Sequence, residues 1–183
     1  VTLVDTVSVR SELGIPEGNK VVLVGSGSLG SGISEELLVE LSALPKVSTV
    51  VVCGKNTDAF RNLVARFAGT SVVPLGYHEP MEELYSIADI FVTKPGGLTI
   101  AEALRHQLPL LISHVLPGQE ELNYQYLSER GLVMPEPVSN VSAVTEELER
   151  GTFRSELKKN TSIGLLVGDG SVAVQVVDSL LKQ

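Results

Sequence analysis

The chain has 183 residues, a length that fits one domain with a substantial core. Its 43% of hydrophobic residues are spread throughout, as in globular proteins, and no apolar run approaches the ~20 residues of a membrane span. A net charge of −8 without any basic cluster argues against a nucleic-acid partner. The single cysteine, Cys53, excludes an internal disulfide and fits a reducing compartment.

Short apolar runs alternate with amphipathic segments, after a lead-in or linker at 1–19. The predicted strands are 21–24, 49–53, 71–75, 90–93, 109–113 and 132–134. The predicted helices are 32–44, 57–67, 81–88, 98–106, 120–130, 141–150, 152–161 and 171–182. Strands that are apolar throughout are typical of a parallel sheet covered on both faces. We therefore predict one α/β domain over 20–183, a doubly wound, Rossmann-like, six-stranded sheet that binds ligands at the carboxyl ends of its strands.

The first predicted strand runs into a glycine turn, Gly25-x-Gly27-Ser28-x-Gly30, which matches the dinucleotide-binding pattern. Such a turn can hold phosphates, although it also occurs as a tight turn without a ligand. An NAD site needs an acidic residue where the second strand ends, to bind the ribose. That strand ends in Val52-Cys53-Gly54-Lys55, so the sequence disfavours an NAD dehydrogenase.

A second glycine turn, Lys94-Pro95-Gly96-Gly97-Leu98-Thr99, joins the fourth strand to a helix. The free N–H groups of the helix start and its positive dipole end predict an anion site. Glu102 lies one turn inside, where a carboxylate could reach a diol beside that anion; the alternative is a solvated carboxylate on a helix face. Two glycine turns facing one crevice predict a bound diphosphate, and hence a nucleotide or nucleotide-sugar.

Two further loops carry groups suited to such a ligand. The loop at 76–81 could pair with the edge of a base, covered by Tyr77 or Met81, and the start of the helix after the fifth strand offers amides and carboxylates for sugar hydroxyls. The histidines show no metal-ligand spacing, and we find no arrangement typical of nucleophilic catalysis.

The motif from Lys94 to Ala103, followed by Leu108-Pro109 and Pro117-Gly118-Gln119-Glu120-x-x-Asn123, closely resembles monogalactosyldiacylglycerol synthases and processive diacylglycerol glucosyltransferases. More distantly it resembles the N-acetylglucosaminyltransferase that acts on the lipid-linked peptidoglycan precursor. These are inverting GT-B enzymes with two Rossmann-like domains. The resemblance runs from about Val21 to Gly131, with a weaker echo at 168–171, and covers the C-terminal, donor-binding half.

The resemblance implies a role for each matching position in binding a UDP-sugar without an obligatory metal. Main-chain groups of the two glycine turns would bind the diphosphate, the 76–81 loop would frame the uracil, with His78 acting through its main chain, and Glu102 would hold the ribose. The helix after the fifth strand would face the donor sugar. The implied donor-binding residues are Gly27, Ser28, Gly30, Tyr77, His78, Met81, Gly96, Gly97, Leu98, Thr99, Glu102, Gln119, Glu120 and Asn123.

We therefore expect the donor half of an inverting hexosyltransferase that acts on diacylglycerol or a glycolipid. The general base is expected in an N-terminal acceptor domain absent from this chain, so the fragment alone should be inactive. The full-length enzyme should be cytoplasmic, with its acceptor domain at the membrane surface. The alternatives are a UDP-sugar 2-epimerase, a non-catalytic nucleotide-binding module and, less favoured, an NAD oxidoreductase.

Overall fold

A computed structural model describes residues 4–25, 34–134, 141–160 and 163. The strands are β1 Lys20–Gly25, β2 Val47–Val52, β3 Val72–Leu75, β4 Ile90–Thr93 and β5 Leu110–Ile112. The helices are α1 Thr6–Glu12, α2 Glu35–Ser42, α3 Thr57–Arg66, α4 Met81–Ile87, α5 Gly97–Arg105, α6 Gln119–Glu129, α7 Ser142–Arg150 and α8 Thr152–Lys159. In this part of the chain no helix is long and apolar enough to cross a membrane.

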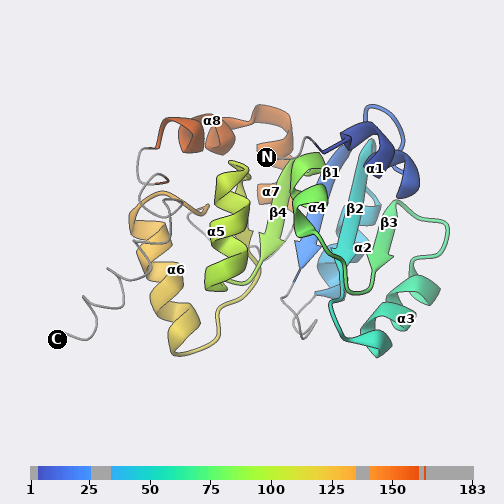
Figure 1. The fold of residues 1–183 in the computed structure, drawn as a ribbon, viewed down its shortest axis with the longest axis horizontal. Coiled ribbons are helices and arrows are strands. Elements are labelled where there is room, and N and C mark those ends of the chain that lie inside the picture. Colours follow the sequence, from blue (N-terminus) through green and yellow to red (C-terminus); the bar gives the residue numbers. More distant parts are fainter. Residues whose placement is uncertain (1–3, 26–33, 135–140, 161–162, 164–183) are drawn as a thin grey trace.

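The five strands form one parallel sheet in the order β3-β2-β1-β4-β5 (Figure 1). This order confirms the predicted doubly wound, Rossmann-like architecture. β3 lies at the edge of the sheet, a position that suits Pro74 because proline has no N–H to leave unpaired on the outer side.

Both faces of the sheet are buried, as the apolar strands predicted. Val21 and Leu23 of β1 point to one face, where α4, α5, α6 and α8 cover them. Val22 and Val24 point to the other face, towards α2, α3 and α7. Successive side chains of a strand point in opposite directions, so a strand covered on both sides must be apolar at every position.

One strand of the predicted sheet is not formed. Among the described residues, the segment 132–134 makes a single backbone hydrogen bond to β5, from the N–H of Met134 to the carbonyl of Leu110 at 2.9 Å. Leu132 and Val133 are buried by packing under the helices instead. The segment is apolar because it is buried, and one hydrogen bond makes no ladder, so the described part of the sheet has five strands.

The lead-in differs from its prediction. Residues 1–19 were predicted as a lead-in or linker, whereas α1 spans Thr6–Glu12 and is capped by the carboxylate of Asp5. Its Val9 packs against the core on the α4 side of the sheet. The predicted final helix at 171–182 lies outside the described residues.

The strand order creates a crevice where β1 and β4 meet. Gly25 pairs with Thr93, so the connections after these two strands begin side by side at the carboxyl edge. The chain then continues into α2 on one face and into α5 on the other. Such a switch point is where ligands bind in open α/β sheets.

Gly25 lets the ring of Phe91 lie against the end of β1. A Cβ added at Gly25 would lie 3.3 Å from Cε2 of Phe91. The ring has little freedom to move away, because it is 1% exposed and contacts the ring of Tyr85 at a centroid distance of 5.6 Å. The small residue therefore allows close packing at the floor of the crevice.

We expect Gly25→Ala to lower the free energy of unfolding by about 1–2 kcal/mol, because overpacking a filled core forces neighbouring side chains to shift. Urea unfolding followed by circular dichroism measures the change. Gly76→Ala is the matched control, since a Cβ there meets nothing within 4 Å. Equal midpoints for the two variants would contradict this account of Gly25.

Candidate nucleotide-sugar site

A cavity of about 570 Å³ opens at the carboxyl edge, between α4, α5 and the ends of β1 and β2. Its size is within the usual range for small-molecule sites. Six of the predicted donor-binding residues line it: Tyr77, His78, Met81, Leu98, Thr99 and Glu102. Tyr77 and His78 come from the connection between β3 and α4, Met81 begins α4, and the others come from the first two turns of α5. Segments about twenty residues apart in the sequence thus meet around one space.

The start of α5 is open, as the second glycine turn predicted. Gly96 is the N-cap, and no side chain of the described residues caps the helix. A Cβ at either Gly96 or Gly97 would meet nothing within 4 Å, so these glycines leave space instead of filling a tight turn. The side chain of Leu98 is 76% exposed, and its predicted role depends on its main chain. The N–H groups of the first turn can therefore approach an anion.

The loop before α4, which was predicted to frame the uracil, forms one side of the cavity. Tyr77 lies at the rim, where its hydroxyl donates to Glu79 at 2.9 Å, and this hydrogen bond raises the pKa of Tyr77. The Nζ of Lys55 lies 5.7 Å from the centre of the same ring. The Nε2 of His78 lies 3.2 Å from a carboxylate oxygen of Glu83. The imidazole thus faces α4, which leaves the main chain of His78 as the part suited to a base edge.

The residues predicted to face the sugar lie outside this cavity, at the start of α6. Two of them hold the second glycine turn in place. The Nζ of Lys94 lies 2.9 Å from Oε1 of Glu120, whose Oε2 accepts a hydrogen bond from the N–H of Leu116 at 3.1 Å. The Nδ2 of Asn123 donates to the carbonyl of Pro95 at 2.9 Å.

The ion pair with Lys94 also affects the protonation of Glu120. The hydrogen bond from Lys94, helped by that from Leu116, lowers the pKa of Glu120. With both oxygens engaged, Glu120 holds the second glycine turn against α6.

Helix α6 begins after Gly118, whose φ of 102° suits only glycine, and the exposed Gln119 is its first residue. The sequence placed these residues at the start of the helix after the fifth strand, and it did not predict their contacts with the second glycine turn.

Three residues that the sequence did not single out also line the cavity: Tyr85, Arg105 and His106. The hydroxyl of Tyr85 donates to Oε2 of Glu102 at 3.1 Å. The signal that could have pointed to Tyr85 is chemical, because a buried tyrosine hydroxyl needs a hydrogen-bond partner.

The first glycine turn, with the predicted phosphate ligands Gly27, Ser28 and Gly30, lies outside the described residues. Only its anchor, Gly25, is described, and it lines the cavity. Within the described ranges, no group of three or more His, Cys, Asp or Glu side chains has the arrangement of a metal site.

Comparison with known sequences shows to which family this chain belongs. A model of the glycosyltransferase family 28 C-terminal domain matches residues 21–162. The chain belongs to this family. The processive diacylglycerol β-glucosyltransferase of Bacillus subtilis is 33% identical over 169 residues, which are 90% of this chain and 44% of that enzyme. The enzyme of the same name from Staphylococcus saprophyticus is 33% identical over 133 residues, 71% of this chain and 34% of the enzyme.

Solved structures share the fold of this glycosyltransferase domain. Anabaena HepE in complex with UDP and glucose superposes with a TM-score of 0.70 and 18% identity, covering 100% of this chain and 53% of that one. The UDP-GlcNAc 2-epimerase of Neisseria meningitidis bound to UDP-GlcNAc gives 0.63 and 17%, covering 96% and 48%. The predicted resemblance is confirmed, and the chain spans about half the length of the proteins it matches.

Lys94→Met should lower stability at neutral pH by about 1 kcal/mol, because Glu120 loses its cation. The pKa of Glu120 in the folded chain lies below its usual 4.5, so the contribution of the pair is complete above that pH and disappears as pH falls through the lowered value. We therefore expect the difference in unfolding free energy between wild type and variant to shrink below about pH 4.5. Urea unfolding across pH measures it, with Lys158→Met on α8 as the charge-matched control. A pH-independent difference would contradict this role for the pair.

Proposed function

We propose that this chain is the UDP-sugar-binding half of an inverting glycosyltransferase that transfers a hexose to a lipid acceptor, diacylglycerol or a glycolipid. The observation that carries the proposal is the cavity beside the open start of α5, lined by six of the residues expected around uracil, ribose and diphosphate. The names of the relatives that are 33% identical to this chain over the matched residues support the acceptor class.

The chemistry of the site suits the departure of UDP. In such a transfer an acceptor hydroxyl attacks the anomeric carbon, the bond from that carbon to the diphosphate breaks, and negative charge develops on the diphosphate. The N–H groups of Gly97, Leu98 and Thr99, at the positive end of the α5 dipole, would stabilise this charge without a metal. Glu102 would accept hydrogen bonds from the ribose hydroxyls on the same side of the cavity.

The acceptor side would belong to another part of the full-length protein. We propose that a preceding domain holds the lipid, contacts the membrane surface and supplies the general base, and that this half alone binds the donor without turnover. The full-length enzyme would then be cytoplasmic and associate peripherally with the membrane. UDP-sugar is its substrate, and no further cofactor is required.

Two alternatives use the same cavity. A UDP-sugar 2-epimerase would bind the same donor and need no acceptor, and its fold is similar. A non-catalytic nucleotide-binding module would bind UDP without any reaction. Product analysis of the full-length protein with UDP-hexose, with and without diacylglycerol, separates the three. Transfer requires the lipid, epimerisation does not, and the module gives no product.

Calorimetry with UDP tests the proposal on this chain directly. We expect saturable heat and a rise in melting temperature, and we expect Glu102→Ala to weaken UDP binding about tenfold, a loss of ~1.4 kcal/mol. Glu149→Ala, which removes an exposed carboxylate from α7, should bind UDP like the wild type. A folded wild-type chain without heat or thermal shift at millimolar UDP would refute the proposal.

Gly97→Ala separates binding from folding. An added Cβ meets no atom within 4 Å, and alanine is the better helix former, so stability should stay the same or rise by up to ~1 kcal/mol. UDP affinity should nevertheless fall about tenfold, because the methyl group occupies the approach to the N–H groups.

Gly69→Ala is the converse control for this variant. Its φ of 76° disfavours alanine, so it should lower stability, and it lies between α3 and β3, so UDP affinity should not change. Melting curves and calorimetry measure both quantities. Unchanged UDP affinity in Gly97→Ala would remove the start of α5 from the site.

A further inference from the structure

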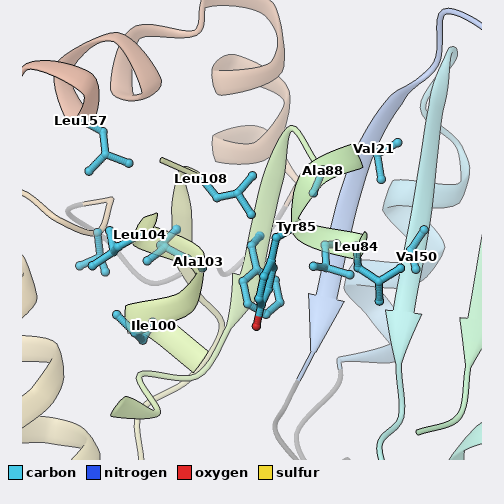
Figure 2. Packing of buried hydrophobic residues seen from close by; sticks show 14 of the residues in the cluster. Val21, Val50, Leu84, Tyr85, Ala88, Ile100, Ala103, Leu104, Leu108 and Leu157 are labelled. Carbon is cyan, nitrogen blue, oxygen red and sulfur yellow. The ribbon is translucent and has the colours of Figure 1, made fainter. Parts of the chain in front are cut away.

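One buried hydroxyl joins the two helices that form the cavity wall. Tyr85 of α4 is 3% exposed, and its hydroxyl donates to Oε2 of Glu102 on α5 at 3.1 Å. Both residues line the cavity. In Figure 2 the hydroxyl oxygen of Tyr85 points towards the same end of the sheet as the tips of the strand arrows, which is the end where the cavity opens.

The ring of Tyr85 is held by aromatic neighbours. The centroid of Phe91 on β4 lies 5.6 Å away with an interplanar angle of 54°, and that of His106 lies 5.6 Å away at 46°. Leu84 and Ile87 on the same helix are buried beside it. The ring therefore has one orientation available, and the position of its hydroxyl is set by the core.

The hydroxyl keeps its proton at neutral pH. Burial raises the pKa of Tyr85 well above its ordinary value of 10, and the nearby charge of Glu102 and their hydrogen bond raise it further. Tyr85 is therefore always the donor of this bond and Glu102 the acceptor.

The bond leaves Glu102 with capacity for a ligand. Its Oε2 accepts from Tyr85, and its Oε1 takes no hydrogen bond from the described residues. A carboxylate offers about four acceptor positions, so this one can still accept from two neighbouring hydroxyls of a ribose. A carboxylate that is oriented before binding loses less conformational entropy when the ligand arrives.

We infer that Tyr85 is a positioning residue that orients the Glu102 carboxylate towards a vicinal diol, and thereby makes the site select ribonucleotides over 2′-deoxyribonucleotides. The inference rests on the proposed function, since it takes the ligand to be a UDP-sugar. It goes further in assigning sugar selectivity to a residue that would not itself contact the ligand. A purely architectural tyrosine would affect stability alone and would leave selectivity unchanged.

The test compares UDP with 2′-deoxy-UDP. Calorimetry gives both dissociation constants for wild type, Tyr85→Phe and Glu102→Gln. We expect wild type to bind UDP at least tenfold more tightly than 2′-deoxy-UDP, a difference of about 1.4 kcal/mol. In Tyr85→Phe this ratio should fall at least threefold, mainly through weaker UDP binding. The double variant should have the ratio of Glu102→Gln alone, because Tyr85 acts through Glu102.

Tyr126→Phe is the matched control. Tyr126 lies on α6 under the guanidinium of Arg130 and is not among the cavity residues, so its loss of a hydroxyl should leave the ratio unchanged. Circular dichroism establishes that each variant is folded, and Tyr85→Met provides a second side chain without a hydroxyl if Tyr85→Phe unfolds.

The outcomes are distinguishable. A wild-type ratio in folded Tyr85→Phe, or equal weakening of both ligands, overturns the inference and leaves the proposed function standing. A wild-type chain that binds neither ligand overturns both. A ratio that falls in Tyr85→Phe and not in Tyr126→Phe supports the positioning role.

Discussion

The structure depends on the parallel pairing of β1 with β4, which places Gly25 beside Thr93 at the carboxyl edge. From this pair the chain leaves towards opposite faces of the sheet, because the crossover from β1 to β2 runs on the α2 side and that from β4 to β5 runs on the α5 side. The two crossovers have the same handedness but run in opposite directions along the sheet, so their helices must lie on opposite faces. The ends of β1 and β2 line the cavity, so the position of the site follows from topology before any side chain is considered.

Charge around the crevice explains why main-chain groups matter. The chain carries a net charge of −8, and the cation nearest the second glycine turn, Lys94, is already paired with Glu120. An anion at the start of α5 would therefore be held chiefly by N–H groups and the helix dipole, which neither titrate nor need an unpaired lysine. This arrangement suits a leaving diphosphate, because fixed dipoles need no reorganisation when charge develops.

The sequence predicted the features that depend on local patterns. The strand at 90–93 and the start of α5 were correct to within one residue, because an apolar run, a glycine pair and helical spacing are all local signals. The strand at 132–134 was wrong because Leu132 and Val133 are apolar for packing under helices, and an apolar run of three cannot distinguish these environments. The bond from Tyr85 to Glu102 could not be predicted, since it spans 17 residues and depends on how α4 lies against α5. The roles of the individual donor-binding residues remain predictions.

The contacts of Lys94 and Asn123 change what α6 can contribute to the site. Both oxygens of Glu120 are engaged, and the side-chain amide of Asn123 donates a hydrogen bond to the carbonyl of Pro95. These contacts fix the distance between the second glycine turn and α6, the helix predicted to face the sugar. The same principle operates on the other side of the cavity, where Tyr85 fixes Glu102. In both places a polar group of the predicted site is oriented by a neighbour before any ligand arrives. Such preorganisation reduces the entropy lost when a ligand binds.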